Sequence, residues 1–390
     1  MPLPRVNIKA KRNQAMAKSE RINTGEIEVG KALPWPVYDA AGVLLLKKGM
    51  VIQTERQLHI LLNRGLYRNA LDRAVNDEPK AIEEDKTSPF SYLADFSERL
   101  KQAFGAIFKK AVDAEKRIMR LASDIQSLCA KDADALLGAV HLHHDMEYTA
   151  FHPIHVAILC EIFGEYLEIA ESQRLDILCA ALTANVSIVK LQTQLHSQAS
   201  TMTEEQKREM EAHPLRSEEM LRAAGISSSL WLTTVAQHHE RNNGLGYPNG
   251  LQGDAILRES KIIALSDIYC AMVVAKSYRA AHPANDILRV LFVNKGKEFD
   301  EQLCLQLIKI MGVFPPGSFV KLENGEIAVV TTRASNGAMW PRVASILSPR
   351  GGPYGNPLRR DCNEADYKIK EMCSLDGNIP LNLHKLWNYR

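Results

Sequence analysis

The sequence predicts a mainly α protein in which a small α+β module precedes a helical bundle and a β-hairpin follows it. Three observations support this fold class. Apolar residues recur at helical spacing through most of residues 91–312, and turn residues separate short apolar runs near both ends of the chain. No apolar run reaches the roughly 18–20 residues that a membrane span needs, so we expect no membrane partner.

The composition is that of a soluble globular protein with two or three domains. The chain has 390 residues, of which 46% are hydrophobic and 24% charged. The formal net charge is +2 without a dense basic stripe, so we expect no nucleic-acid partner. Seven cysteines lack a C-x-x-C pair and no signal peptide is apparent, which predicts a reducing, cytoplasmic location.

The N-terminal part divides into three predicted segments. Residues 1–24 are polar and basic and predict a flexible arm. Residues 25–72 predict a small α+β module, with a strand, a turn at Asp39–Gly42 and a second strand, then a short helix capped by Thr54. Residues 73–90 are charged and contain Pro79 and Pro89, so we expect a linker.

The central and C-terminal parts are predicted from apolar periodicity. Apolar residues in 91–130 repeat about every 3.5 residues and predict one long connecting helix, whose apolar stripe either forms a homodimer seam or packs on its own chain. Residues 131–312 predict a helical domain. Residues 313–347 predict a β-hairpin extension that turns at Asn324-Gly325, and 348–390 an uninformative tail.

Histidines and one acid lie on consecutive predicted helices of this domain. His152 lies on one helix, His213-Pro214 opens another and His238-His239 ends a third, while Asp267 interrupts an apolar helix. A buried aspartate costs several kcal/mol unless it is paired or bound to a metal. Histidine and aspartate together suit metals such as Fe, Mn, Zn or Ni, so the pattern predicts a metal site.

The segment that follows these histidines resembles a known family signature. Residues 238–251, from His238 to Leu251, resemble the HHE-x-x-[DN]-G-x-G-Y-P-x-G-L motif of HD-GYP domains, which belong to the HD superfamily. The resemblance runs from about Tyr148 to Ile310 and includes the predicted helix start at Thr203. It implies an HD-superfamily helical bundle that hydrolyses cyclic di-GMP with two or three metal ions, often iron or manganese.

The resemblance also implies roles for individual residues. His213, His238 and His239 would bind one metal, and His152 and Asp267 a second. Other positions would contact the ligand or shape the loop beside it, and this GYP loop would also contact diguanylate cyclase domains. The implied ligand contacts are Lys276, Arg279 and Tyr247, and the loop residues are Gly244, Gly246, Tyr247 and Pro248.

The sequence departs from the family at its name-giving motif. The segment that reads H-D-x-G-K in the family aligns with residues 184–188, where Ala184, Asn185 and Ile188 replace its His, Asp and Lys. That aspartate bridges both metals, and two dications about 3.5–4 Å apart repel strongly without a shared anionic oxygen. We therefore expect one ion or none, with two ions disfavoured.

Three functions remain open from the sequence. The chain could bind cyclic di-GMP or a partner without hydrolysing it, or act as a structural interaction scaffold. It could also be an active phosphodiesterase with a rebuilt site, in which Asp145, beside His143-His144 and seven residues before His152 on one helix, lends a carboxylate. Cys270 is expected to be a small buried apolar residue. His155 and His196 are expected to be surface or core residues without a role in the site.

Overall fold

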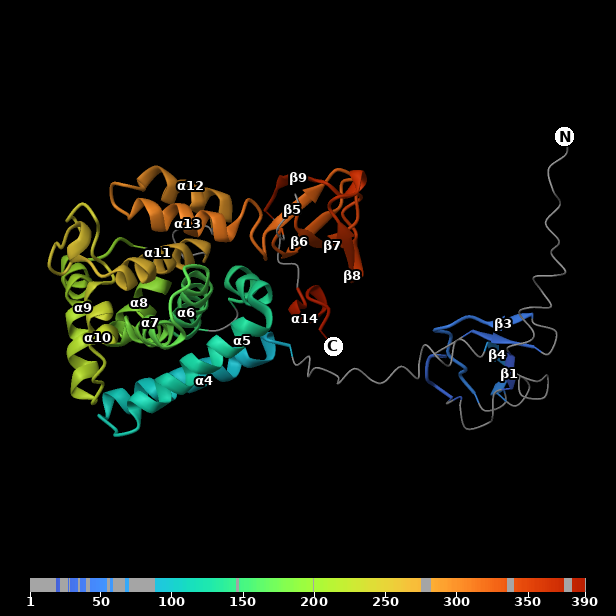
Figure 1. Cartoon of the computed structure of the whole chain (residues 1–390), viewed down its shortest axis with the longest axis horizontal. Helices are drawn as coiled ribbons and strands as arrows, with labels where there is room; N and C mark the ends of the chain where they lie inside the picture. Colours follow the sequence, from blue (N-terminus) through green and yellow to red (C-terminus); the bar gives the residue numbers. More distant parts are fainter. Residues whose placement is uncertain are drawn as a thin grey trace. The chain divides into compact units, whose positions relative to one another are not determined.

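The computed structural model describes residues 19–21, 27, 29–33, 36–39, 43–54, 57–58, 67–69, 88–144, 147–198, 200–274, 282–334, 340–374 and 381–389. The chain divides into two compact units, Met1–Lys86 and Thr87–Arg390 (Figure 1). The second unit contains every predicted site residue and is mainly helical, as the sequence predicted.

The first unit contains a small antiparallel sheet with strand order β1-β4-β2-β3. Its strands are β1 (Ser19–Arg21), β2 (Val37–Tyr38), β3 (Leu44–Leu46) and β4 (Tyr67–Asn69). The two predicted strands are confirmed, because β2 pairs with β3, and Asp39 Oδ1 accepts the Val43 N–H at 2.8 Å, while residues 40–42 of the predicted turn lie outside the described residues. Thr54 Oγ1 accepts the Gln57 N–H at 3.3 Å, as a helix cap does.

The boundaries predicted for the arm and the linker need correction. Residues 19–21 of the predicted arm form β1, which pairs with β4, while residues 1–18 lie outside the described residues. Residues 70–87, which include most of the predicted linker, also lie outside them. Phe90, the last residue of the predicted linker, instead begins the first helix of the second unit.

The prediction of one long helix over 91–130 is wrong. The structure forms two helices, α4 (Phe90–Phe108) and α5 (Ala114–Leu142), which pack against each other. Helix α4 ends where Lys110 adopts φ +53°, and the Ala111 N–H bonds the Ala106 carbonyl at 2.9 Å. Glycine is the usual residue in this left-handed conformation, so a lysine there gave no signal for the break.

The apolar stripe of 91–130 is buried within a single chain. Leu93 and Leu100 of α4 and Ile118, Leu121 and Ile125 of α5 are fully buried in the main core. The apolar period continues across the break because both helices cover the same side of the bundle. This burial agrees with packing on the chain itself, the second of the two interpretations.

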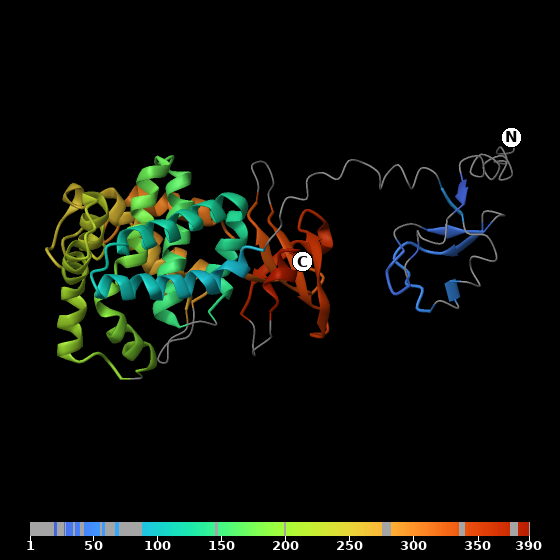
Figure 2. The ribbon, with the colours of Figure 1, turned by 90° about the horizontal axis from the view of Figure 1, so that it is seen from below.

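Among the remaining helices of the bundle, α6 is apolar on all sides and contacts α5, α7 and α11. Helices α9 and α10 lie at the end of the domain opposite the C-terminal sheet (Figures 1 and 2). The elements are α6 (Tyr148–Tyr166), α7 (Glu171–Thr183), η2 (Val186–Ile188), α8 (Val189–Ser197), α9 (Glu204–Ala223), α10 (Ser229–Gln237), η3 (Gly253–Ala255), α11 (Arg258–Val273), α12 (Ala284–Asn294) and α13 (Glu301–Met311).

Helix α9 begins at the predicted residue but contains His213-Pro214 in its interior. Thr203 and Gln206 form a reciprocal capping box at its start. The prediction that His213-Pro214 opens a helix is therefore wrong. Proline is expected at helix starts, and here it is tolerated within a helix because His213 takes over a freed carbonyl, as described below.

One described segment, Glu171–Ser197, is long and apolar enough to cross a membrane, but 67% of its most apolar window is buried inside the domain. It consists of α7, η2 and α8, with non-helical backbone at Asn185 between them. We therefore assign it to the core of the bundle.

The C-terminal part forms a five-stranded antiparallel sheet with strand order β8-β7-β6-β5-β9. The predicted hairpin is confirmed as β5 and β6, with Gly325 at φ +87° in the turn. Residues 348–390, for which the sequence predicted only a tail, supply β8, β9 and α14. The elements are β5 (Phe319–Leu322), β6 (Ile327–Thr332), β7 (Arg342–Leu347), β8 (Pro353–Asp361), η4 (Ala365–Tyr367), β9 (Ile369–Met372) and α14 (Leu383–Leu386).

Both the sheet and α14 pack on the helical bundle. Arg333, just after β6, pairs with Asp134 of α5 at 2.5 Å. The Trp387 indole covers Gly138 of α5 so closely that a Cβ on this glycine would lie 2.2 Å from the ring. Phe90 meets Trp387 edge to face at 5.3 Å. The second unit is therefore held together from Phe90 to its C-terminal segment.

Candidate metal centre

His213 is oriented by the proline that follows it. Pro214 has no N–H, so the Met210 carbonyl loses its helical partner, and His213 Nδ1 lies 2.5 Å from that carbonyl oxygen. Nδ1 must therefore carry the proton and donate it. His213 Nε2 consequently presents a lone pair to the interior, as a metal ligand does.

His238 is oriented in the same way by a helix end. It follows the last residue of α10, where backbone carbonyls lack intrahelical partners, and its Nδ1 lies 2.6 Å from the Val235 carbonyl oxygen. His238 Nε2 is thereby an acceptor as well. Two helices thus each present one histidine with the same fixed tautomer.

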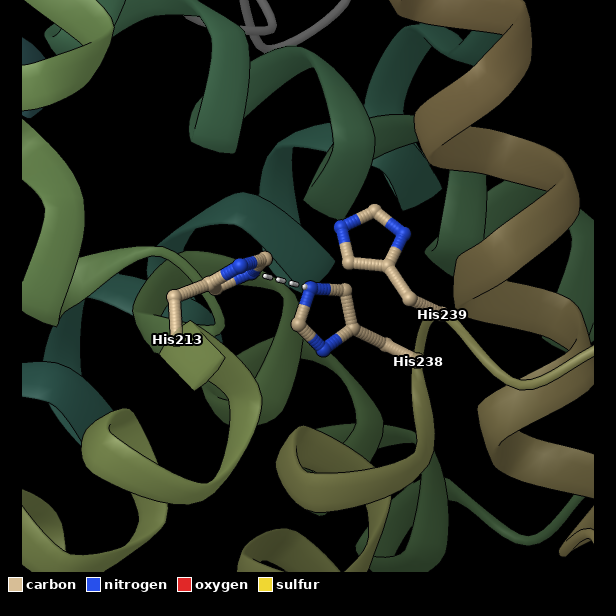
Figure 3. A group of neighbouring side chains, drawn as sticks. All are labelled: His213, His238 and His239. Atoms are coloured by element: carbon tan, nitrogen blue, oxygen red, sulfur yellow. Dashed lines mark hydrogen bonds between the residues drawn. The ribbon is translucent and has the colours of Figure 1, made fainter. Parts of the chain in front are cut away.

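The two Nε2 lone pairs point at each other. His213 Nε2 and His238 Nε2 are 3.1 Å apart, and Figure 3 shows the rings converging together with that of His239. Two acceptors at this distance repel unless a proton or a cation lies between them. Two nitrogens each about 2.1 Å from one ion are expected to lie about 3 Å apart, so the spacing suits a shared metal ion.

Burial keeps these imidazoles neutral. Burial, with a smaller contribution from the charge of His238, lowers the pKa of His213 to about 3. Burial also lowers the pKa of His238 and of His239. Neutral histidines are the form that binds metals.

His239 completes the group and connects it to the GYP loop. Its ligand atom and those of His213 and His238 all lie within 4.8 Å of one another. Its carbonyl accepts the Tyr247 N–H at 3.2 Å, and the two rings are 4.8 Å apart. The loop therefore packs directly against the third histidine.

The loop is anchored to the residues that follow the histidines. The buried Glu240 carboxylate accepts the Asn249 N–H at 2.8 Å and the Leu251 N–H at 2.9 Å. A Cβ on Gly246 would lie 2.4 Å from the Arg241 nitrogen and 2.6 Å from the His239 oxygen. Only glycine permits this approach of loop and backbone.

His152 and Asp267 form a pair of their own. His152 Nε2 lies 2.9 Å from Asp267 Oδ1, and His152 is buried. Burial alone would raise the pKa of Asp267, but the hydrogen bond and charge of His152, with His239 and His238, lower it below the usual carboxyl range. His152 Nδ1 is buried without a hydrogen-bond partner among the described residues.

Ala184 and Asn185 lie in a segment whose flanking residues are hydrogen-bonded to α9 and α10. Just before them, Thr183 Oγ1 accepts the Trp231 Nε1–H of α10 at 2.8 Å, and just after them, Ser187 Oγ donates to the His213 carbonyl at 3.1 Å. Asn185 is 8% exposed, and its amide forms no hydrogen bond to any described residue. Ala184 and Ile188 are buried and bring no ligand atom.

The three histidines could together hold a metal ion. Three histidines supply three neutral nitrogens, the number that leaves a position open for water or a ligand. Of the described residues, only these three form a His/Cys/Asp/Glu group this tight, and it contains no carboxylate. His152 and Asp267 form a separate pair, and the sequence aligns neutral Ala184 and Asn185 with the family's further ligands.

Several predicted residues lie outside this description. Lys276 and Arg279 fall in 275–281, and Asp145 in 145–146, none of which the structure describes. His143-His144 follows the end of α5 at Leu142, and α6 begins at Tyr148, so these histidines do not share a helix with His152.

The sequence analysis gave no role to two other residues near the centre, Tyr148 and His196. Tyr148 stacks on His152 at 4.7 Å and on His196 at 4.9 Å. The spacing of four residues between Tyr148 and His152 could have placed both on one helix face, but nothing local indicated His196. Cys270 is buried as expected, and burial raises the pKa of its thiol well above the ordinary value.

Comparisons with known proteins agree with this geometry. Residues 118–303 match the HD domain family. A "Cyclic di-GMP phosphodiesterase PA4108" from Pseudomonas aeruginosa is 26% identical over 59% of this chain and 55% of its own. A "3'3'-cGAMP-specific phosphodiesterase 3" from Vibrio cholerae is 27% identical over 53% of this chain and 45% of its own. The chain spans about half the length of these curated relatives.

A solved structure shares the fold. The protein "Bd1817, a HDG"Y"P protein from Bdellovibrio bacteriovorus" superposes with a TM-score of 0.51 at 14% identity, covering 75% of this chain and 99% of its own. At this identity the likeness concerns the fold alone.

Proposed function

Since residues 118–303 of this chain are an HD domain of the HD-GYP type, we propose that the chain binds a cyclic dinucleotide of the cyclic di-GMP class and has lost most or all of its hydrolysis. The observation that carries the proposal is the group of three neutral histidines, which contains no carboxylate, together with Asn185 at the position where the family has its bridging aspartate. Relatives act on cyclic di-GMP or on 3'3'-cGAMP, so both are candidate ligands.

The chemistry follows from the charges of the site. A divalent ion at His213, His238 and His239, with iron or manganese as first candidates, would supply a Lewis-acidic centre for a phosphate oxygen. Because all three ligands are neutral, the full charge of that ion remains to attract an anionic phosphodiester. A second ion close by would lack the shared anionic oxygen that makes such a pair stable. The site therefore favours binding over two-metal hydrolysis.

The test combines metal analysis, binding and turnover on the full chain loaded with Mn²⁺ or Fe²⁺. We expect at most one ion per chain, saturable binding of cyclic di-GMP or 3'3'-cGAMP, and no release of linear product. Asn185→Asp alone and with Ala184→His should raise the metal content towards two ions and create turnover. His213→Ala should remove the single ion.

The other candidate functions predict different outcomes. Two ions per chain with turnover by the unaltered chain would contradict the proposal and indicate a rebuilt phosphodiesterase site. Absence of both metal and ligand would indicate a scaffold. In that case the GYP loop is the surface to examine for contacts with diguanylate cyclase domains, because Leu245 at its tip is 79% exposed. A Leu245→Arg variant that lost capture of a purified cyclase domain would then support this function.

A homodimer through residues 91–130 would need a second surface on these helices, because the apolar stripe is buried in the chain itself. Sedimentation of the full chain at several concentrations tests whether such a dimer forms.

A further inference from the structure

The segment that contains Asn185 is joined to α9 by a closed network of two serine hydroxyls. Ser187 Oγ donates to the His213 carbonyl at 3.1 Å and lies 2.9 Å from Ser217 Oγ. The Ser187 N–H in turn donates to Ser217 Oγ at 3.3 Å. With the Ser217 hydroxyl donating to Ser187 Oγ, each hydroxyl donates once and accepts once.

This network lies directly behind a metal ligand. Ser217 is one helical turn after His213, and both residues are fully buried. The His213 carbonyl is bonded by Ser187, while the His213 ring is fixed by the Met210 carbonyl. Backbone and ring of the same histidine are therefore held from two sides by hydrogen bonds within the protein.

Ser187 stands where the H-D-x-G-K segment has a glycine, which has no hydroxyl to offer. A shared ion would tie residues 184–188 to α9 through a carboxylate at 185, but Asn185 has no charge for that role. On the other side of Asn185 in the sequence, the hydrogen bond between Thr183 and Trp231 similarly connects the segment to α10 without a charge. Neutral hydrogen bonds thus connect this segment to both helices that carry the histidines.

We propose that Ser187 and Ser217 are positioning residues that hold His213 in its ligand position in the metal-free chain. The inference rests on the proposed one-ion site and adds that this site is formed before the ion arrives. A preorganised ligand loses little conformational freedom on binding, so the serine pair raises the affinity for the first ion. Loss of a supporting contact behind a metal ligand typically weakens metal binding about 10–100-fold.

The test is a titration of the metal-free full chain with Co²⁺, followed by its visible absorption. We expect Ser217→Ala and Ser187→Gly each to weaken Co²⁺ binding about 10-fold or more, and the double variant to add little because both serve one network. Ser187→Thr keeps the hydroxyl and should bind as the unaltered chain does. Ser197→Ala is the matched control, since Ser197 Oγ bonds only carbonyls of its own helix α8.

Melting temperatures of the metal-free variants separate positioning from general stability. A lower melting temperature with unchanged Co²⁺ affinity in Ser217→Ala would overturn the proposal and leave a purely structural role. If the unaltered chain binds no Co²⁺, the metal part of the proposed function fails, and hydrogen exchange still tests the serine network. Backbone amides of 185–188 and 212–217 should then exchange faster in Ser217→Ala than in Ser197→Ala. Equal exchange rates would refute the positioning role.

Discussion

Asn185 has nearly the shape of an aspartate but lacks its charge, and the surrounding residues do not compensate for this loss. Asp267 is paired with His152, and Glu240 is bonded to amides of the GYP loop. Both of these acids are therefore already bonded to other groups. This is why one substituted side chain bears on the number of ions that the site can hold.

Gly246 gives a first prediction at this scale. Gly246→Ala should destabilise the domain by about 1–3 kcal/mol, because its Cβ would meet the backbone of residues 239–241 at 2.4–2.6 Å. The loop must then move away from His239, so metal affinity should fall about 10-fold or more. Urea unfolding and Co²⁺ titration measure the two effects.

Gly105→Ala is the control for this change, because a Cβ there meets no neighbour within 4 Å in α4. It should be neutral or slightly stabilising. If Gly246→Ala behaved like this control in both measurements, the close approach of the loop would affect neither stability nor metal affinity, and the prediction would be wrong.

The second prediction concerns the pH dependence of folding stability, which follows from the buried neutral histidines. Burial lowers the pKa of His141 to about 4, and burial lowers that of His213 to about 3, whereas unfolded histidines titrate near 6.5. The unfolded chain thus binds more protons below pH 6.5, so stability is full above that pH and falls as the pH drops. The expected loss for the metal-free chain is about 2 kcal/mol per histidine between pH 6.5 and 5.

Asp267 contributes in a different pH window. Its lowered pKa stabilises the fold above the ordinary carboxyl pKa, so that contribution is lost only below about pH 4. Urea unfolding followed by far-ultraviolet circular dichroism at pH 7, 6 and 5 measures the slope, and His141→Gln should reduce it by about one proton. A stability that is constant from pH 7 to 5 would contradict the burial of neutral histidines.

At the scale of elements, the buried stripe of α4 and α5 allows a third prediction. Leu121 is fully buried in the chain's own core, so Leu121→Ala should cost about 2–5 kcal/mol of unfolding free energy without changing the oligomeric state. Met119 on the same helix is 38% exposed, and Met119→Ala should cost little. Sedimentation and urea unfolding of both variants distinguish core packing from a dimer seam, since dissociation caused by Leu121→Ala would indicate the seam.

The elements also show what the sequence could and could not predict. Periodicity and turn residues located the bundle helices and the hairpin at Asn324-Gly325 because those signals are local. The α4–α5 break was missed because Lys110 takes a conformation that glycine usually marks, and His213-Pro214 was misplaced because the proline is accommodated by a side-chain hydrogen bond. The resemblance identified the three histidines, but their shared tautomer depends on carbonyls that only the folded helices bring close.

For the whole molecule, the compact second unit is larger than its family match. The match ends at residue 303, yet the unit extends through the sheet and α14 to Arg390. The serine network, the stack of Tyr148 with His196, and the packing of Trp387 on Gly138 all join residues far apart in sequence. Such contacts carry no local sequence signal. The sequence therefore predicted the candidate metal ligands but not the residues that hold them in place.

The last prediction concerns a chain truncated after Gly312, which should be less stable than the full chain. The truncation removes the Arg333–Asp134 pair and the Trp387 indole that covers Gly138 and Phe90, so it uncovers apolar surface of α4 and α5. Loss of several kcal/mol from a unit of this size should lower the melting temperature by at least about 5 °C. Trp387→Ala in the full chain should give a smaller decrease, because the sheet remains. If the truncated chain melted at the same temperature as the full chain and still bound one Co²⁺ ion, the C-terminal sheet and α14 would be independent of the metal centre rather than part of its support.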